Sequence, residues 1–377
     1  MNIPKLRFKE FEGEWLKEEL KNIFEISSKK FNPKKTLENM KCIELEHLSQ
    51  ETGELLGYTD SIKQESTKNK FDKGQVLFGK LRPYLKKFWI TNFEGVCSSE
   101  IWVLNGLKIS NNYLFQMIQT NKFNQIANIS SGSKMPRADW KYMAEIPFFY
   151  PSNKSEQQKI ATFLSTIDQK IEQLTKKKTL LESYKKGVMQ KIFAQQIRFK
   201  RDDGGEFVDW EEKRLKDVLD YEQPTKYLVK TTDYSDRYKI PVLTAGKTFI
   251  LGYTNETNGI YDNLPVIIFD DFTTANHYVD FNFKIKSSAM KLLKVKDKNI
   301  DLKFIYETMQ MLHFPLGEHK RYWISEYSYL KIQLPELEEQ QKIANFLTSL
   351  DQKITQTTQQ IEAMKRFKKG LLQGMFV

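Results

Sequence analysis

The residue types that could support catalysis are present, but their spacing does not fit known catalytic motifs. Ala245-Gly-Lys-Thr resembles the end of a phosphate-binding loop, but that motif requires a glycine five residues before Gly246, where Pro241 stands. The chain lacks the Asn-Pro-Pro-Tyr or Asp-Pro-Pro-Tyr segment used in adenine methylation, and it lacks a glycine-rich turn suited to S-adenosylmethionine. We therefore expect no catalytic residues in this chain.

Carboxylate, histidine and cysteine side chains also lack the grouping that a metal site requires. Asp270 and Asp271 could be a pair of metal ligands, but they follow an apolar run and precede a turn that begins at Phe272. We favour a role for them in capping that turn. The other candidate ligands show no ligand spacing, so we expect no metal. They are His47, His277, His313, His319, Cys42 and Cys97.

Basic and small polar side chains instead gather near predicted turns, where they could contact nucleic acid. The stretch from Ser130 to Arg137 is small and basic, and backbone amides in such a stretch can approach phosphates. Basic turns are often only solvated, so the groups carry this prediction more than any single residue. The candidates are Lys80, Arg82, Lys86, Lys87, Ser133, Lys134 and Arg137 in the first half of the chain, and Lys247, Thr273, Thr274, Asn276, His277, His319, Lys320 and Arg321 in the second.

The net charge points to a polyanionic partner, although the charge is uneven. The chain has 377 residues and a formal net charge of +11. Residues 1–154 carry 24 basic and 18 acidic side chains, whereas residues 200–337 carry 20 and 22, so charge alone gives no argument that the second half binds DNA. Without a secretory leader or an apolar run of about 18 residues, we expect a cytoplasmic protein with no membrane segment, and a disulfide between Cys42 and Cys97 is the less favoured alternative.

The element that must position these residues occurs twice. Residues 156–193 begin E-Q-Q-K-I-A-T-F-L-S-T-I-D-Q-K-I and residues 339–376 begin E-Q-Q-K-I-A-N-F-L-T-S-L-D-Q-K-I, at a constant offset of 183 residues (339 − 156). Two copies of this length indicate a duplicated unit, so the chain is predicted to form two equivalent halves, each a globular body followed by this segment. Asp168 and Asp351 occupy equivalent positions, which favours a repeated structural or docking role over acid–base chemistry.

Apolar residues at steps of four and three run through both copies, as in the a and d positions of a coiled coil. A helix of about 38 residues spans roughly 57 Å at 1.5 Å per residue. Since neither helix can bury this seam alone, we expect the two copies to pack against each other within one chain, in antiparallel orientation; a dimerisation zipper is the alternative. The predicted seam consists of Ile160, Leu164, Ile167, Ile171, Leu174, Leu181, Ile343, Leu347, Leu350, Ile354, Ile361 and Met364.

The remaining segments are predicted to form two α+β bodies. Short apolar runs broken by turn residues predict strands, such as G-Q-V-L-F-G-K-L-R in the first body and P-V-I-I-F-D-D-F in the second. Both bodies open with R-F-K followed by a tryptophan, Trp15 or Trp210, while their middles differ. The predicted domains are the first body at residues 1–154, a helix at 155–196, the second body at 197–337 and a helix at 338–377.

Together these segments resemble the specificity subunit of type I restriction-modification systems. The resemblance is carried by the paired E-Q-Q-K-I-A-x-F-L segments, each after a proline-bounded strand (Ile146-Pro-Phe-Phe-Tyr-Pro and Ile332-Gln-Leu-Pro). Supporting segments are V-L-F-G-K-L-R-P-Y-L, C-S-S-E-I and S-G-S-K-M-P-R-A-D-W in the first body, and L-T-A-G-K, I-I-F-D-D-F-T and S-S-A-M-K-L-L in the second. The match covers essentially the whole chain.

The resemblance implies a non-catalytic protein that selects double-stranded DNA. Each body would be a target recognition domain that reads one half of a bipartite, asymmetric site, and the two helices would hold the bodies apart and dock two methyltransferase subunits. Those subunits, with up to two restriction subunits, would bind S-adenosylmethionine, ATP and Mg, and this chain would bind no cofactor. The alternative, from another class, is a coiled-coil scaffold whose two bodies bind protein or RNA.

Overall fold

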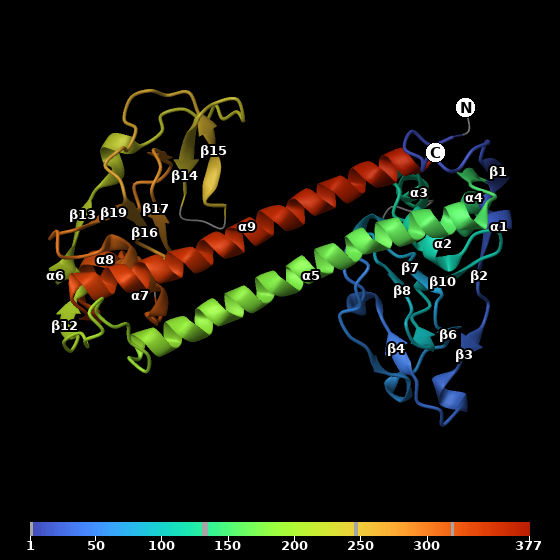
Figure 1. Cartoon of the computed structure of the whole chain (residues 1–377), viewed down its shortest axis with the longest axis horizontal. Coiled ribbons are helices and arrows are strands. Elements are labelled where there is room, and N and C mark those ends of the chain that lie inside the picture. The colour runs from blue at the N-terminus through green and yellow to red at the C-terminus, as the bar shows by residue number, and fades with distance from the viewer. Residues whose placement is uncertain (1–2, 130–134, 245–247, 318–319) are drawn as a thin grey trace. The chain divides into compact units, whose positions relative to one another are not determined.

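The chain divides into two compact units, each containing one body and parts of two long helices. The computed structural model describes residues 3–129, 135–244, 248–317 and 320–377. The first unit comprises Met1–Lys176 and Thr358–Val377, and the second comprises Lys177–Thr357. The long helices α5 (Lys154–Phe193) and α9 (Leu337–Met375) each contribute one part to each unit (Figure 1).

The body of the first unit contains three β-sheets. One is an antiparallel sheet in the order β2-β10-β7-β8, one is a mixed sheet in the order β3-β6-β9-β4-β5, and β1 pairs with β11. The strands are β1 (Leu16–Glu19), β2 (Phe24–Ile26), β3 (Lys30–Phe31), β4 (Lys41–Ile43), β5 (Thr59–Asp60), β6 (Lys68–Phe71), β7 (Val76–Gly79), β8 (Phe88–Ile90), β9 (Gly95–Cys97), β10 (Ile101–Gly106) and β11 (Pro147–Tyr150). The helices are α1 (Leu20–Ile23), α2 (Asn111–Met117), α3 (Asn121–Ala127) and α4 (Trp140–Ala144), with 3-10 turns η1 (Pro33–Lys35), η2 (Leu45–His47), η3 (Ser61–Lys63) and η4 (Pro83–Leu85).

The apolar runs of the first body form strands that are covered on both faces. In β7, Val76 and Phe78 belong to one hydrophobic cluster and Leu77 belongs to another. Successive side chains of a strand point to opposite faces, so a strand buried on both sides needs a continuous apolar run. The helices that cover one face are preceded by the N-cap residues Ser110 and Thr120, whose hydroxyl groups accept backbone hydrogen bonds and so cap α2 and α3.

The body of the second unit repeats the central part of this arrangement. Its antiparallel sheet has the order β13-β19-β16-β17, β12 pairs with β20, and a third sheet has the order β15-β14-β18. The strands are β12 (Glu211–Arg214), β13 (Leu219–Glu222), β14 (Ile240–Leu243), β15 (Ile250–Thr254), β16 (Val266–Asp270), β17 (Asn276–Val279), β18 (Lys284–Ile285), β19 (Met290–Val295) and β20 (Lys331–Leu334). The helices are α6 (Leu215–Val218), α7 (Leu302–Met311) and α8 (Tyr322–Ser325), with η5 (Pro224–Tyr227) and η6 (Tyr327–Tyr329).

The duplication therefore extends into the bodies. The pairs β1-β11 and β12-β20 correspond, and so do the four-stranded sheets, whereas the remaining sheet has five strands in the first body and three in the second. The prediction of two bodies with mixed helices and strands is confirmed at this level. Their shared frame lies next to the long helices, and their differences lie in the remaining sheet.

The two long helices begin and end close to the predicted limits. The observed starts at Lys154 and Leu337 lie one residue before the predicted ones, and the helices contain 40 and 39 residues, about 60 Å each at 1.5 Å per residue. Asn153 Oδ1 accepts a hydrogen bond from the Ser155 amide at 2.8 Å at the start of α5. None of the helices in the described part of the chain combines the length and apolar character that crossing a membrane requires.

Candidate nucleic-acid interface

A buried carboxylate attaches the first body to the start of α5. Glu156 is 1% exposed and accepts hydrogen bonds from Arg7 Nε at 2.7 Å and Nη2 at 2.9 Å, and from Trp15 Nε1 at 3.2 Å. These three residues are called the Glu156 cluster. The hydrogen bond to Glu156 raises the pKa of Arg7 above its ordinary value. Because a buried charge is costly unless it is paired, the first turn of α5 is held against residues 7–15.

The second unit contains the same arrangement, here called the Glu339 cluster. Glu339 is fully buried and accepts hydrogen bonds from Arg198 Nε at 3.1 Å and Nη2 at 2.7 Å, and from Trp210 Nε1 at 3.0 Å. Hydrogen bonding to Glu339 likewise raises the pKa of Arg198. The sequence showed both arginines, both tryptophans and both glutamates, but it did not show that they meet. Each body is thus fixed to its helix by the same three residue types.

The next residue of each helix, Gln157 or Gln340, binds a loop of its body. Gln157 Oε1 accepts from the amide of Ser110, the N-cap residue of α2, at 3.1 Å, and its Nε2 donates to the Pro151 carbonyl at 2.9 Å. Gln340 does the same with the amide of Asp301, the N-cap of α7, at 2.8 Å, and the Pro335 carbonyl at 2.8 Å. The repeated Glu-Gln pair is therefore a body-attachment motif.

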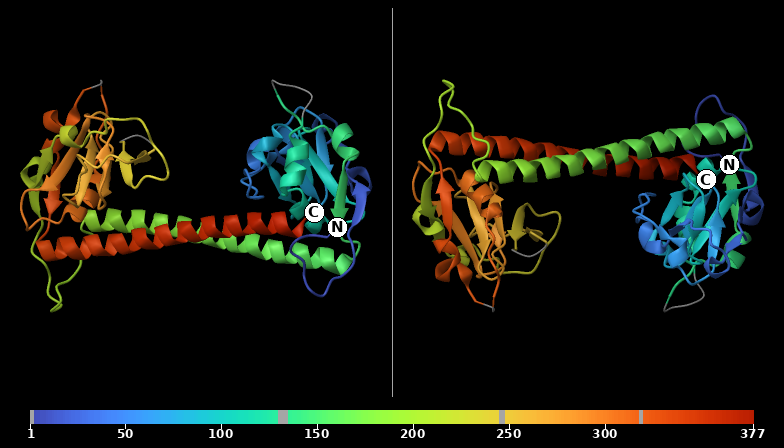
Figure 2. Two further views of the ribbon diagram at one scale, coloured as in Figure 1. Left: turned by 90° about the horizontal axis from the view of Figure 1, so that it is seen from above. Right: turned by 90° about the horizontal axis from the view of Figure 1, so that it is seen from below.

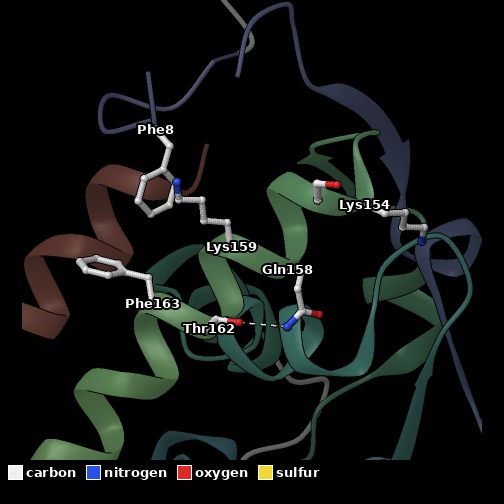
Figure 3. A pocket seen from close by; sticks show the side chains of 7 residues that line it. Phe8, Lys154, Gln158, Lys159, Thr162 and Phe163 are labelled. Atoms are coloured by element: carbon white, nitrogen blue, oxygen red, sulfur yellow. Dashed lines mark hydrogen bonds between the residues drawn. The ribbon is translucent and has the colours of Figure 1, made fainter. Parts of the chain in front are cut away.

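Aromatic side chains also meet at each helix start, with a lysine beside them in the first unit. Lys159 Nζ lies 4.7 Å from the centroid of the Phe8 ring, and Phe8 meets Phe163 edge to face with 5.7 Å between centroids (Figure 3). These side chains line an open groove of about 700 Å³ along residues 154–163, about the first three turns of α5. In the second unit Phe199 meets Phe346 in the same edge-to-face manner, at 5.8 Å.

Further along each helix an ion pair joins α5 to α9. In the first unit Lys368 Nζ lies 2.5 Å from Asp168 Oδ1, and in the second Lys185 Nζ lies 2.7 Å from Asp351 Oδ1. The two ion pairs are related by the repeat offset of 183 residues (351 − 168 and 368 − 185). The expected repeated role of Asp168 and Asp351 is thus structural. In the first unit the C-terminal part of α9 lies beside the first part of α5 (Figure 1 and Figure 2).

The predicted seam residues are all removed from solvent at least in part, but the bodies cover much of the seam. At the helix starts, Ile160, Leu164 and Ile167 share a cluster with core residues of the first body, and Ile343 and Leu347 do so in the second. The same clusters also contain residues of the other long helix, Leu372 and Met375 in the first unit and Met189 and Ile192 in the second, so at these positions the seam packs against both the body and the other helix. Eight seam residues are buried, namely Ile160, Leu164, Ile167, Leu174, Ile343, Leu347, Leu350 and Ile361, and four are half-buried, namely Ile171, Leu181, Ile354 and Met364.

Three of the predicted DNA-contact residues of the first body are brought together. The Arg82 amide donates to the Pro136 carbonyl at 2.8 Å, and the Ala138 amide donates to the Lys80 carbonyl at 2.9 Å, so Arg137 lies opposite Leu81. The Arg137 guanidinium donates to both carboxylate oxygens of Glu100, at 3.0 and 3.1 Å. Ser133 and Lys134 lie outside the described residues.

Lys86 and Lys87 follow on the turn that contains η4. Lys86 Nζ lies 2.7 Å from Glu51 Oε1, and Lys87 Nζ donates to the Leu45 carbonyl at 2.5 Å. Arg82 and Lys86 have positive φ angles of 53° and 48° at the two ends of η4. The ammonium groups of Lys86 and Lys87 are therefore engaged within the body. The Lys86–Glu51 ion pair is exposed, so it contributes little to stability and Lys86 can exchange its partner.

Four of the predicted contacts of the second body, Thr273, Thr274, Asn276 and His277, lie on the turn after β16 and on β17. The Asp270 carboxylate accepts the amides of Phe272 and Thr273 at 2.8 Å each, so the predicted capping role is observed for this residue. His277 stacks on Phe249 with 4.1 Å between ring centroids, and burial lowers the pKa of its imidazole. Thr273 and Thr274 lie on the turn, and Asn276 lies on β17, where its Oδ1 accepts a hydrogen bond from Gln310 Nε2 at 2.6 Å. Lys320 lies beside Glu326, and Arg321 directly precedes α8. Lys247 and His319 lie outside the described residues.

Asp271 differs from its predicted role as a turn cap. It is fully buried, lies 3.4 Å from Nζ of the buried Lys291, and accepts the Trp323 amide at 2.8 Å. This carboxylate therefore fixes α8 to the central sheet, a contact between residues 52 positions apart that the local sequence does not reveal. Among the described residues, no group of three or more histidine, cysteine, aspartate or glutamate side chains is arranged to hold a metal ion.

These features define a class of protein: a duplicated, two-body protein in which like attachment sites carry bodies with different sheets. A family model described as Type I restriction modification DNA specificity domain matches residues 12–183 and again residues 207–366. The two matches together cover most of the chain. The chain therefore belongs to this family.

Individual relatives are similar either over a short segment at high identity or over nearly the whole chain at low identity. The type I restriction enzyme EcoR124I/EcoR124II specificity subunit of Escherichia coli is 62% identical over 126 residues, which are 32% of this chain and 31% of that protein. The chain thus matches about a third of the length of this relative. The putative type I restriction enzyme MjaX specificity subunit of Methanocaldococcus jannaschii is 25% identical, with 98% of this chain and 95% of that protein covered. The crystal structure of the type I restriction-modification S subunit from M. genitalium shares the fold, with a TM-score of 0.66, 16% identity, and 100% and 99% of the chains covered.

Replacing the buried carboxylate tests the attachment of the first body. Glu156→Gln leaves the Arg7 guanidinium without its carboxylate partner, so we expect a loss of about 2 kcal/mol or more in the free energy of unfolding. The matched control is Glu172→Gln, which removes the same charge from an exposed position of α5. Denaturant unfolding followed by circular dichroism measures both variants, and equal midpoints would contradict the structural role of Glu156.

The two ion pairs between α5 and α9 should differ in their response to mutation. Lys185 retains Glu307 at 3.2 Å when Asp351 is replaced. When Asp168 is replaced, the partner that Lys368 keeps among the described residues is the neutral Gln119. We therefore expect Asp168→Asn to cost about 1–2 kcal/mol of unfolding free energy and Asp351→Asn clearly less. Hydrogen exchange of the helix amides in each unit measures the effect locally; the opposite ranking would show that Glu307 does not compensate.

His277 should remain neutral at pH 7. Burial lowers its pKa, so the folded protein binds this proton less tightly than the unfolded chain does. The contribution of this neutral imidazole to the free energy of unfolding is then fully present above the usual histidine pKa of about 6.5. It is lost as the pH falls through the lower pKa of the folded state. Nuclear magnetic resonance titration of the imidazole should give a midpoint below about 6.5, and His277→Gln should remove this part of the pH dependence. A midpoint above 6.5 would overturn the assignment.

Proposed function

We propose that this chain is a non-catalytic DNA-specificity subunit of a type I restriction-modification complex. Each body reads one half of a bipartite, asymmetric site in double-stranded DNA. Family membership supports this proposal, since the family model matches the chain twice, once over each body and most of the helix that follows it. The function belongs in the cytoplasm, where DNA and the partner subunits are found.

The main observation behind this proposal is that the contacts attaching each body to its helix are repeated, whereas the whole body is not. The Glu156 and Glu339 clusters hold equivalent frames, but the remaining sheet has five strands in one body and three in the other. A protein that recognises two different ligands by one mode of presentation needs this combination. A homodimer with identical bodies would instead favour a palindromic site, because operator symmetry follows protein symmetry.

The helices are proposed to form an antiparallel coiled coil with pseudo-twofold symmetry. The ion pairs support this orientation, because the residue number rises from Asp168 to Lys185 on α5 while that of the partner falls from Lys368 to Asp351 on α9. Two helices of 40 and 39 residues, about 60 Å each, would then set the separation of the half-sites. One helical turn of duplex DNA occupies about 34–36 Å, so such a length covers a gap between two half-sites.

The chemistry is proposed to reside in partner subunits. Two methyltransferase subunits would dock on this chain and bind S-adenosylmethionine, and up to two restriction subunits would bind ATP and Mg. This chain would contribute the choice of site. Phosphate contacts from lysine and arginine would position the bodies, and side chains at base edges, such as Asn276 and the neutral His277, would specify the sequence.

Exchange of one body tests the proposal directly. If residues 1–154 are replaced by the first body of another family member, we expect one half of the methylated sequence to change and the other half to stay the same. The Glu156 cluster makes the exchange feasible when Arg7 and Trp15 are retained, since these residues supply the contacts to α5. Genome-wide mapping of methylated adenines in cells that carry the partner subunits gives the readout.

The matched control exchanges residues 197–337 by the same rule, retaining Arg198 and Trp210. It should change the other half of the site. A single exchange that alters both half-sites together would show that the bodies do not read DNA independently. A chain that binds RNA or protein but selects no duplex from a random pool would overturn the DNA-specificity function itself.

A further inference from the structure

A basic groove in the first unit lies between the body and the C-terminal part of α9. Its volume is about 430 Å³. Five cations line it: Lys86 from the turn that contains η4, and Lys365, Arg366, Lys368 and Lys369 from α9. Four carboxylates also line it, those of Glu51, Glu54, Asp168 and Glu362. The groove therefore joins a turn predicted to contact DNA to a helix that was not predicted to contact it.

The cations of this groove differ in how far they are engaged. Lys368 is paired with Asp168 at 2.5 Å, Lys86 with Glu51 at 2.7 Å, and Lys365 with Glu362 at 3.3 Å. Arg366 and Lys369 are exposed and make no hydrogen bond or ion pair with any residue that the structure describes. Two positive charges at the groove are thus left without a partner in the described part of the chain.

Cations from α9 and from the body turn lie close enough together to affect the same carboxylate, that of Glu51. The hydrogen bond from Lys86, and also the charges of Lys369 and Lys365, hold the pKa of Glu51 below its ordinary value. Residues 365, 366 and 369 lie on one side of the helix, because positions four apart are neighbours on a helix surface. The positive charges of Lys365 and Lys369 on α9 and of Lys86 on the body turn therefore all act on the Glu51 carboxylate.

The internal repeat shows that part of this positive charge is not required by the structural frame. At the repeat offset of 183 residues, α5 has Glu182 and Ser183 in place of Lys365 and Arg366, whereas Lys369 corresponds to another lysine, Lys186. The paired lysine is also present in both copies, as Lys368 and Lys185. The frame thus forms without a cation at the position of Arg366, so the positive charge of Arg366 is not needed for folding.

We propose that this groove binds the sugar-phosphate backbone of DNA beside the half-site that the first body reads. Arg366 and Lys369, together with Lys86, contact backbone phosphates, Arg366 through the paired N–H groups of its guanidinium. Phosphate contacts carry no sequence information directly, so the contact is independent of sequence. This inference rests on the proposed DNA-binding function and assigns to α9 a direct part in it.

The double variant Arg366→Gln with Lys369→Gln tests the proposal in the full-length chain. Affinity should fall alike for a selected target duplex and for a random-sequence duplex of the same length. Loss of two phosphate contacts should reduce the slope of log affinity against log salt by about 1.8, so the defect should shrink about tenfold between 50 and 200 mM salt. The sequence selected from a random duplex pool should be unchanged.

The matched control is Lys170→Gln with Lys176→Gln, which removes the same charge from exposed positions of α5 in the same unit that do not line the groove. It should leave the salt slope nearly unchanged. Unfolding midpoints of both double variants should equal that of the natural chain, because all four side chains are exposed. An equal loss of affinity in both variants would show a general charge effect and would overturn the site.

Two other outcomes separate the proposals. If the Arg366 and Lys369 variant keeps the natural affinity and salt slope for DNA but loses association with the methyltransferase subunit, the groove binds an acidic protein surface and the inference is wrong. If the natural chain itself selects no duplex, the proposed function fails and not merely this site. Unchanged DNA binding and unchanged subunit association in the variant would also reject the groove as a binding site.

Discussion

The structure depends on two carboxylates that are buried at the starts of the long helices. A charged group that leaves water is stable only where donors surround it, and Glu156 and Glu339 each receive two hydrogen bonds from an arginine and one from a tryptophan. These donors have fixed directions, so they set the angle as well as the position of the body on its helix. Gln157 and Gln340 then fix the helix that follows the central sheet, α2 or α7.

This constraint leaves the rest of each body free to differ. Gln116 of the first body donates to Asp168 at 3.3 Å, and the corresponding position of α7 carries Glu307. The added carboxylate is neutralised by Lys303 of the same helix, at 2.9 Å, as well as by Lys185 of α5. Much of the charge change is therefore balanced within the body itself. A frame built in this way accepts different bodies with little demand on the helices.

The sequence predicted what depends on local patterns, namely the repeat, the limits of the long helices, the two α+β bodies and the turn capped by Asp270. It could not predict contacts between distant residues. Arg7 contacts Glu156, 149 positions away in the sequence, and Asp271 is neutralised by Lys291 of the neighbouring strand. The sequence around these residues does not indicate either contact. Lys86 and Arg137 could likewise be identified as basic residues from the sequence, but their ion pairs with Glu51 and Glu100 could not.

Burial separates arginines that hold the frame from arginines suited to nucleic acid. Arg7 pairs with the carboxylate of Glu156, which is 1% exposed. Replacing this carboxylate would leave the largely buried Arg7 guanidinium without a charged partner. Arg137 pairs with Glu100 where both side chains meet water, at 46% and 27% exposure. Exposed ion pairs of this kind contribute little, so exchange of the Glu100 carboxylate for a phosphate costs the fold little. The same residue type thus serves structure where it is buried, and where it is exposed it can take part in the proposed DNA binding.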